Sequence, residues 1–291
     1  MGRDAMAREY DIIGDVHGCA DELRALLSAL GYGPTGPHVF NPFYQGAAWV
    51  HPEGRTAVFL GDLIDRGPDS IGVVGHVSAM VAAGAARCVM GNHEYKLLRV
   101  LDGARAADTS DHLAIEAAIV AACRALGGDE NGGDVRGRAP RARAWLRGFL
   151  VERPVYLSLA GGRLIAVHAA LLADMLTKAE RTGVVNSAMR GMCLHGQTDG
   201  TLDMYGLPTR RDDWTGDFRS GVRLVVYGHT PGDSPLWEHD TVCIDGGCVF
   251  GGSLLALRYP ERNIVRVPAT RAYAHSPFIR PGVVGRVGRS A

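Results

Sequence analysis

Short runs rich in valine, isoleucine and leucine recur along the chain, and each has the length of a buried strand. They are YDIIG (10–14), TAVFLG (56–61), ARCVMG (86–91), RLIAVH (163–168), VRLVVYG (222–228) and a longer run over 241–259. Between them, patterns typical of helices cover residues 20–30, 70–83, 93–101 and 112–126. This alternation of strands and helices predicts an α/β fold.

Several of these runs end at a glycine that lies next to an aspartate, an asparagine or a histidine. In order, the polar residues at these ends are Asp15, His17, Asp62, Asp65, Arg66, Asn92, His93, Glu94, His168 and His229. In open α/β sheets, ligands bind beyond the carboxyl ends of the strands. We therefore expect these side chains to meet in one site.

The chemistry of this set indicates a metal centre. Carboxylates, imidazoles and amide oxygens are ligands for Mn²⁺, Fe²⁺ and Zn²⁺, whereas Mg²⁺ alone would not explain so many histidines. Two metals about 3.5–4 Å apart and bridged by a carboxylate would use most of the set, and such pairs hold both oxygens of an in-line phosphoryl transfer. GDVHG or GNH alone could be an ordinary turn, but the motifs together favour a metal site.

Length and charge set further limits. The 291 residues are enough for one large α/β domain or two small ones. Lysine plus arginine and aspartate plus glutamate both number 31, so the chain lacks the basic footprint of a dedicated nucleic-acid binder. No apolar run approaches the roughly 20 residues of a membrane span, and no signal peptide precedes the first strand. We expect a soluble, cytoplasmic protein with no membrane partner.

The cysteines show no metal-binding spacing. None forms a C-x-x-C pair, and several lie inside apolar runs, where a thiol behaves as a small hydrophobic group. They are Cys19, Cys88, Cys123, Cys193, Cys243 and Cys248. Neither structural zinc nor a disulfide framework is expected from this spacing.

One shift in composition falls at residues 127–148, where glycines and acids give way to arginines around Trp145, clustered from Arg136 to Arg147. We favour a solvated loop that connects a helical insertion at about 103–148. The alternative is an electropositive rim with an aromatic ring that could stack on a base. Residues 1–9 and the basic segment 269–291 are expected to be tails, the second one frayed.

The strand-end motifs also resemble a known family. D-x-H-G at Asp15, G-D-x-x-D-R-G at 61–67, G-N-H-E at 91–94, V-H at His168 and G-H-T at His229 resemble the calcineurin-like metallophosphoesterases in all five motifs and in order. The resemblance covers about residues 10–268. It implies one domain with a four-layer α-β-β-α sandwich of two mixed sheets and a helical insertion.

Within that superfamily, GDLIDRGPDS resembles the branch of bacterial phosphoprotein phosphatases and symmetrical diadenosine tetraphosphatases. The segment over 205–268 most resembles the phosphatase module of bacterial polynucleotide kinase-phosphatases. The resemblance implies a phosphoesterase that acts on phosphomonoesters, and on 2′,3′-cyclic phosphodiesters as a further option, at nucleotides or at RNA or DNA ends. A symmetrical diadenosine tetraphosphatase, a Ser/Thr protein phosphatase and a non-catalytic nucleotide-binding module are the alternatives.

The resemblance implies two divalent transition-metal ions, with Mn²⁺ preferred over Fe, Zn or Ni. One would be held by Asp15, His17 and Asp62, and the other by Asp62, Asn92, His168 and His229. Asp62 is then the bridge, and a water or hydroxide held between the metals attacks the phosphorus.

Other residues receive roles around these ligands. His93 suits a general acid because it follows Asn92 directly, and Asp65 is its expected orienting partner. Arg66 would bind phosphate oxygens with its planar fork. Asp245 is expected to accept a hydrogen bond from a ligand histidine, or else to be a turn aspartate, and Arg190 is a candidate second phosphate clamp. Glu94, at a helix start, is expected to be structural.

Overall fold

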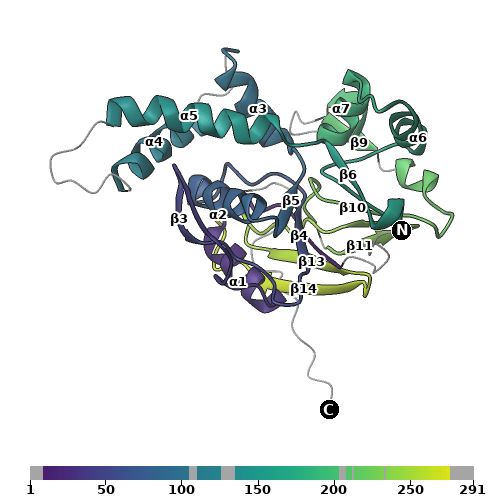
Figure 1. Cartoon of the computed structure of the whole chain (residues 1–291). Coiled ribbons are helices and arrows are strands. Elements are labelled where there is room, and N and C mark those ends of the chain that lie inside the picture. The colour runs from purple at the N-terminus through teal and green to yellow at the C-terminus, as the bar shows by residue number, and fades with distance from the viewer. Residues whose placement is uncertain are drawn as a thin grey trace.

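Two five-stranded mixed sheets pack face to face, and helices cover their outer faces (Figure 1). The computed structural model describes residues 9–104, 110–125, 135–202, 208–211, 213–232 and 234–275. This arrangement confirms the predicted four-layer α-β-β-α sandwich. The remaining residues, which include 1–8 and 276–291 of the predicted tails, lie outside the described part.

The first sheet has the strand order β14-β13-β1-β4-β5. Its strands are β1 (Tyr10–Ile13), β4 (Thr56–Phe59), β5 (Ala86–Cys88), β13 (Ser253–Tyr259) and β14 (Asn263–Pro268). Strands β1, β4 and β5 run parallel, and Ile12 of β1 lies opposite Val58 of β4 and Leu257 of the antiparallel β13. The carboxyl ends of the three parallel strands therefore share one edge.

The second sheet has the order β11-β12-β10-β7-β6. Its strands are β6 (Tyr156–Leu159), β7 (Leu164–Val167), β10 (Leu224–Tyr227), β11 (Leu236–Glu238) and β12 (Thr241–Cys243). Strands β7, β10 and β12 are parallel. The apolar run over 241–259 is thus divided between the sheets, because its glycine-rich middle, 244–252, crosses from β12 to β13.

Alternate residues of each central strand enter two different cores. Leu164 and Ala166 of β7 pack between the sheets, whereas Ile165 and Val167 pack beneath the helices. Because both faces are covered, both must be apolar, which explains why the strands read as continuous hydrophobic runs. The same alternation occurs in β10, where Val226 faces the inter-sheet core.

Helices α1 and α2 lie against the outer face of the first sheet, and α6 and α7 against that of the second (Figure 1). The helices are α1 (Ala20–Leu30), α2 (Ser70–Ala82), α3 (Asn92–Leu101), α4 (Ser110–Ala125), α5 (Val135–Val151), α6 (Ala173–Thr182) and α7 (Ser187–His195), with short 3₁₀ turns at Ala160–Gly162 and Asp213–Asp217. Helix α1 buries Leu23, Leu26, Leu27 and Leu30 on one stripe. Among the described helices, none combines the length and apolarity needed to cross a bilayer.

The insertion is a helical hairpin, so the loop expected through residue 148 is wrong from 135 onward. Helix α5 buries Ala139, Ala142 and Leu146 against the core. Trp145 is half-buried, stacks on Phe149 and meets the edge of Phe43. It therefore packs within the protein, which contradicts the suggested base-stacking role. Residues 127–134 lie outside the described part of the chain.

Two small hairpins and a C-terminal strap complete the domain. The hairpins are β2 (His38–Asn41) with β3 (Tyr44–Ala47), and β8 (Gln197–Leu202) with β9 (Pro208–Arg211). Residues 269–275 form the strap, in which the Tyr273 amide donates to the Val249 carbonyl at 2.8 Å and the Tyr273 hydroxyl donates to Glu22 at 2.8 Å. The tail predicted from residue 269 therefore begins too early.

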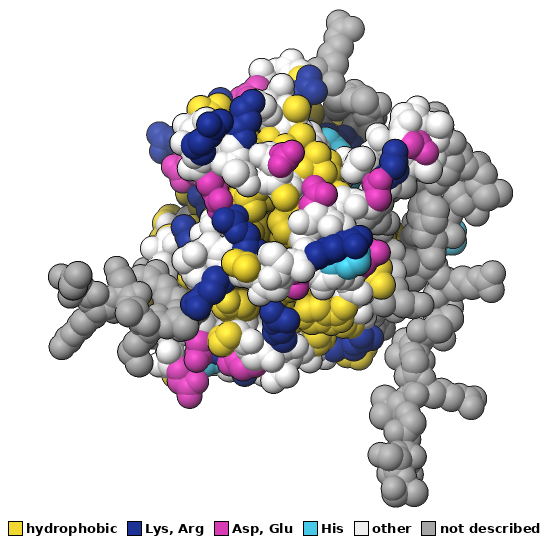
Figure 2. All heavy atoms as spheres, turned by 90° about the vertical axis from the view of Figure 1, so that its right-hand side faces the viewer, with side chains coloured by type: hydrophobic (Ala, Val, Ile, Leu, Met, Phe, Trp, Pro, Cys, Tyr) yellow, Lys and Arg dark blue, Asp and Glu magenta, His cyan; other side chains and the backbone are white. Residues whose placement is uncertain are grey.

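Figure 2 shows the face at the right-hand side of Figure 1, where arginine and lysine side chains are interspersed with acidic and apolar ones. No continuous basic stripe crosses the part of this face that is coloured. This mixture agrees with the equal numbers of acidic and basic residues in the sequence.

Candidate metal centre

The predicted ligands come from loops that follow five parallel strands in two sheets, and Asp245 follows a sixth. Each parallel strand ends at the same side of the molecule, so side chains far apart in sequence converge there. Asp15 and His17 follow β1, Asp62 follows β4, Asn92 follows β5, His168 follows β7, His229 follows β10, and Asp245 follows β12.

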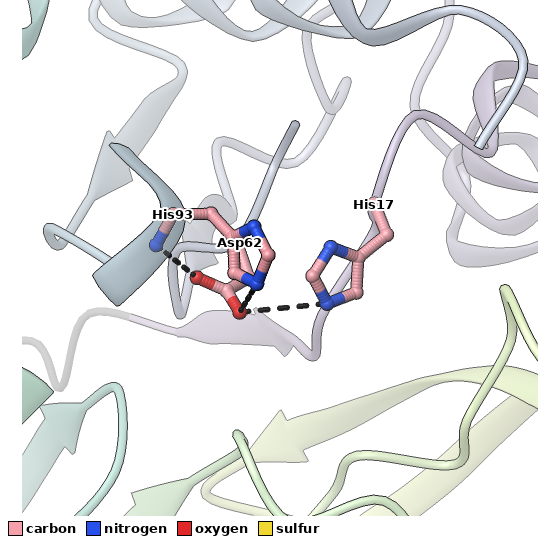
Figure 3. A group of neighbouring side chains, drawn as sticks. All are labelled: His17, Asp62 and His93. Carbon is pink, nitrogen blue, oxygen red and sulfur yellow. Dashed lines mark hydrogen bonds and ion pairs between the residues drawn. The ribbon is translucent and has the colours of Figure 1, made fainter. Parts of the chain in front are cut away.

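Asp62 lies at the middle of this group. Its Oδ2 is 3.4 Å from Nε2 of His17, and its Oδ1 is 3.4 Å from Nε2 of His168. Figure 3 shows its carboxylate between His17 and His93, whose backbone amide donates to Oδ1 at 3.1 Å. Burial alone would raise the pKa of Asp62, but His168, His93, His17 and His229 outweigh it and hold the pKa well below its ordinary value. Asp62 therefore stays a carboxylate.

Two histidines are oriented by backbone carbonyls. Nδ1 of His17 is 2.8 Å from the Ile64 carbonyl, and Nδ1 of His168 is 2.9 Å from the Leu60 carbonyl. Because each Nδ1 donates its proton there, the Nε2 lone pair of the neutral ring faces the centre. Burial also lowers the pKa of His17 to about 3, which keeps that ring neutral.

Lone pairs converge around Nε2 of His168. Oδ1 of Asn92 lies at 2.9 Å and Nδ1 of His229 at 3.0 Å from it. A neutral His168 with its proton on Nδ1 would direct the Nε2 lone pair at the Asn92 oxygen, with no hydrogen between the two atoms. A cation would satisfy this arrangement.

Two groups of potential ligands share Asp62. His17, Asp62 and His93 form one group, and Asp62, His168 and His229 form the other, with the donor atoms of each within 4.8 Å of one another. This geometry suits two ions with one bridging carboxylate. It differs from the sequence prediction in placing His93 beside the first group.

Asp15 adds negative charge to the same site. Its Oδ2 accepts from the His229 amide at 3.0 Å, whereas its Oδ1 has no hydrogen-bond partner among the described residues. Burial raises the pKa of Asp15 strongly, and the charges of Asp245 and Asp62 raise it further. A buried, partly unsatisfied carboxylate beside two others is the setting in which a bound cation stabilises the ionised form.

His93 is held by Asp65. Nδ1 of His93 is 2.6 Å from Oδ2 of Asp65, so Nε2 faces the centre, 3.9 Å from Oδ2 of Asp62. Burial alone would lower the pKa of His93, but the Asp62 charge and the Asp65 hydrogen bond raise it above its ordinary value. The ring is therefore able to carry a proton on Nε2.

The structure places the other predicted residues as follows. Arg66 is exposed, with one guanidinium nitrogen 2.6 Å from Nε2 of His17 and its charge over the Phe250 ring. Asp245 is buried beside Asp15, and its Oδ1 accepts from the Gly247 amide at 3.0 Å. Arg190 is exposed on α7. Their roles in catalysis and phosphate binding stay predictions.

Glu94 makes more structural hydrogen bonds than its position at the start of a helix indicated. Its buried carboxylate accepts from the backbone amides of Asp62 at 2.7 Å, Leu63 at 2.8 Å and Gly91 at 3.1 Å. Glu94 thereby holds the loop that carries Asp62. A glutamate three residues after the N-cap Gly91 could have indicated the bond to the Gly91 amide, which is the half of a capping box that a glycine N-cap allows. It gave no sign of the bonds to the Asp62 loop.

The loops are also unusual in backbone conformation. His17, Asp62, Asp65, Arg66 and His229 all have positive φ, from 43° to 70°. Residues other than glycine seldom adopt this left-handed region, and those that do cluster at functional sites. Hydrogen bonds compensate for the strain, as when the His17 amide donates to the Asp62 carbonyl at 2.7 Å.

The comparisons agree with this geometry. A model of the calcineurin-like phosphoesterase family matches residues 10–245, and the chain belongs to that family. It is a hydrolase of phosphoesters, in a family that uses divalent metal ions.

Proteins of similar sequence or structure within this family are named for the hydrolysis of dinucleoside tetraphosphates. A bis(5′-nucleosyl)-tetraphosphatase PrpE [asymmetrical] from Anoxybacillus flavithermus is 37% identical over 269 residues, which cover 92% of this chain and 98% of the relative. The protein of that name from Bacillus subtilis is 36% identical with the same coverage. A crystal structure assigned provisionally as a diadenosine tetraphosphatase has a TM-score of 0.56 at 21% identity, covers 91% of this chain and 95% of its own, and shares the fold.

Proposed function

We propose that this chain hydrolyses bis(5′-nucleosyl) tetraphosphates asymmetrically, into a nucleoside triphosphate and a nucleoside monophosphate. The observation that carries the proposal is the 36–37% identity, over 92% of the chain, to relatives named for that activity. This choice replaces the symmetrical cleavage considered from the sequence.

The residues present fit two divalent ions. Asp15, His17 and Asp62 would hold one, and Asp62, Asn92, His168 and His229 the other. The shared position of Asp62 and the facing lone pairs at His168 support this assignment. Mixed nitrogen and oxygen donors suit Mn²⁺, Fe, Zn or Ni, and we take Mn²⁺ as the first choice because the family resemblance implies it. Two such ions supply a nucleophile at neutral pH and neutralise charge on the transferring phosphoryl group.

The protein's own groups then complete the chemistry. Nε2 of His93 faces the centre and would donate its proton to the leaving oxygen, while Asp65 fixes the ring. Arg66, exposed at the edge of the centre, would bind a phosphate of the chain by a charge-assisted hydrogen bond. Glu94 positions the backbone of Asp62 and does not touch the substrate.

A second candidate is the phosphomonoesterase at a polynucleotide end. It is favoured by the likeness of residues 205–268 to the phosphatase module of polynucleotide kinase-phosphatases. The equal numbers of basic and acidic residues support only local contacts with such a substrate. The polynucleotide end therefore ranks below the dinucleotide.

The test is a comparison of kcat/KM with Mn²⁺ on diadenosine tetraphosphate, a 3′-phosphorylated oligonucleotide, a 2′,3′-cyclic nucleotide and a phosphopeptide. We expect the dinucleotide to be best and to yield ATP and AMP in equal amounts. ADP as the sole product would mean symmetrical cleavage. Faster phosphate release from the oligonucleotide or phosphopeptide would contradict the substrate assignment. The Asp62→Asn variant, prepared identically, controls for contaminating enzymes.

A further inference from the structure

A second group of metal-ligand types lies outside the candidate centre. The sulfur atoms of Cys19 and Cys248 and a carboxylate oxygen of Glu22 lie within 4.8 Å of one another. All three residues are buried, with 0%, 1% and 2% of their surfaces exposed. Because Cys19 and Cys248 are at opposite ends of the domain sequence, no cysteine-spacing rule could have paired them.

The Glu22 carboxylate is only half satisfied. Its Oε1 accepts hydrogen bonds from the Thr270 amide at 2.9 Å, the Thr270 hydroxyl at 2.5 Å and the Tyr273 hydroxyl at 2.8 Å. Its Oε2 is buried and, within the described residues, has no hydrogen-bond partner. An unpaired buried oxygen of an ionised group is costly, so it points to a ligand.

The helix that carries two of these residues favours anionic ligands. Cys19 is the N-cap of α1, where it makes no side-chain cap bond, and Glu22 is in the first turn. The N-terminal end of a helix stabilises thiolates and carboxylates. The hydrogen bond with Cys19, and then burial, raise the pKa of the Cys248 thiol, so a metal ion would have to displace its proton. Burial alone would raise the pKa of Glu22, but the bonds from Thr270 and Tyr273 lower it overall, so the group is ionised at neutral pH.

We propose that Cys19, Glu22 and Cys248 form a zinc site distinct from the catalytic centre. Two thiolates and a carboxylate suit Zn²⁺, whereas hard ions such as Mg²⁺ avoid sulfur. Binding would release the two thiol protons and leave one coordination position for a water or hydroxyl. This revises the sequence expectation that excluded structural zinc.

The site would join three segments that the chemistry depends on. Cys19 comes two residues after His17, Cys248 three residues after Asp245, and Glu22 holds the strap at Thr270 and Tyr273. A metal ion there would therefore fix the β1 and β12 loops relative to each other. Its role is to support the catalytic loops, not to touch the substrate.

Cobalt titration of the full-length protein, stripped of metal under reducing conditions, tests the proposal. The catalytic donors are nitrogen and oxygen only, so thiolate-to-cobalt charge-transfer absorption in the near ultraviolet can come only from a cysteine site. We expect this band in the wild type, with added zinc displacing it. Its absence from the wild type would overturn the proposal, whatever the enzyme's substrate proves to be.

Variants locate the site. Cys19→Ser and Cys248→Ser should each abolish the band, and Glu22→Gln, which can still accept from Thr270 and Tyr273, should weaken zinc binding. Cys123→Ser, a buried cysteine on α4, is the matched control and should keep the band. A band that survives in both Cys19→Ser and Cys248→Ser, or a Cys19–Cys248 disulfide in protein purified without reductant that binds no zinc after reduction, would refute the site. Circular dichroism of each variant excludes loss by misfolding.

Discussion

At the scale of single residues, His93 is placed to donate a proton. Its Nδ1 is engaged by Asp65 at 2.6 Å, and its Nε2 faces the centre. Replacement by alanine should lower kcat for an alkyl phosphate by ~10²–10⁴-fold, the usual contribution of a general acid. The loss should be much smaller for p-nitrophenyl phosphate, because that leaving group departs without a proton. Steady-state kinetics on the two substrates measure the difference.

Asp65→Asn is the companion variant, since asparagine keeps the shape but weakens the hold on the His93 ring. We expect a smaller loss with the same dependence on the leaving group. If His93→Ala slows both substrates equally and lowers metal content, His93 is instead a ligand. Because His93 lies in one group of potential ligands with His17 and Asp62, the experiment distinguishes a proton donor from a metal ligand.

Asp62 is the one carboxylate common to both ligand groups. Asp62→Asn removes the bridging charge and should reduce bound Mn²⁺ from two ions per chain and abolish nearly all turnover. Mass spectrometry of metal content and far-ultraviolet circular dichroism check that metal is lost while the fold is kept. Asp69→Asn, at the N-cap of α2, is the matched control and should retain both ions. Full activity with one tightly bound ion would refute the two-metal assignment.

Much of the candidate site could be predicted because its ligands follow strand ends, and parallel strands bring their ends together. The role of Glu94 could not, since it depends on the left-handed turn at Asp62 that brings three successive amides, from Asp62 to Ile64, to one carboxylate. The proximity of Cys19 and Cys248 could not be predicted either. It depends on the path of the loop 244–252 between the two sheets, which the spacing of the cysteines in the sequence does not reveal.

At the scale of elements, the strands with continuous apolar runs and the first four helices were predictable, whereas the arginine-rich helix α5 was not. Helix α5 is rich in arginine, yet Ala139, Ala142 and Leu146 form a buried stripe at helical spacing. In α5, tertiary burial of this narrow face outweighs an arginine-rich composition that suggests a loop.

The junction between β4 and α3 depends on Glu94, which accepts backbone hydrogen bonds from both sides of the site. Glu94→Gln would turn an amide NH₂ toward at least one of these N–H donors and leave it unpaired. We expect a loss of ~1–3 kcal/mol in the free energy of unfolding and a fall in kcat. Urea unfolding measures the first, and Glu53→Gln, on an exposed turn, should change neither. Unchanged stability would contradict this role.

In the α4–α5 hairpin, the arginines fall into two kinds. Arg143 binds both carboxylate oxygens of Glu116, whereas Arg138 and Arg141 are exposed. Arg143→Gln should lower the free energy of unfolding by up to ~1 kcal/mol, as for partly exposed pairs. The double change Arg138→Gln with Arg141→Gln should leave KM for diadenosine tetraphosphate unaltered. A raised KM for a 3′-phosphorylated oligonucleotide alone would instead support the electropositive rim considered from the sequence.

At the scale of the whole molecule, the centre is assembled only when the two sheets pack together. Asp15, Asp62 and Asn92 come from the first sheet, and His168 and His229 from the second. The unfolded chain therefore has no such site, and ions that bind the centre stabilise the folded state. They would also offset the burial and the repulsion from Asp245 and Asp62 that together raise the pKa of Asp15.

Metal-depleted protein should accordingly melt at a lower temperature than the Mn²⁺-loaded protein. Free Mn²⁺ at a hundredfold excess over its dissociation constant adds ~2.7 kcal/mol per site to the free energy of unfolding. Calorimetric melting with increasing Mn²⁺ measures this, and the thiol-rich Cys19–Cys248 group contributes little because Mn²⁺ prefers oxygen donors. Asp62→Asn should remove most of the increase, whereas Cys123→Ser should retain it. A melting temperature independent of Mn²⁺ in the wild type would show that the loops of the two sheets do not share a metal.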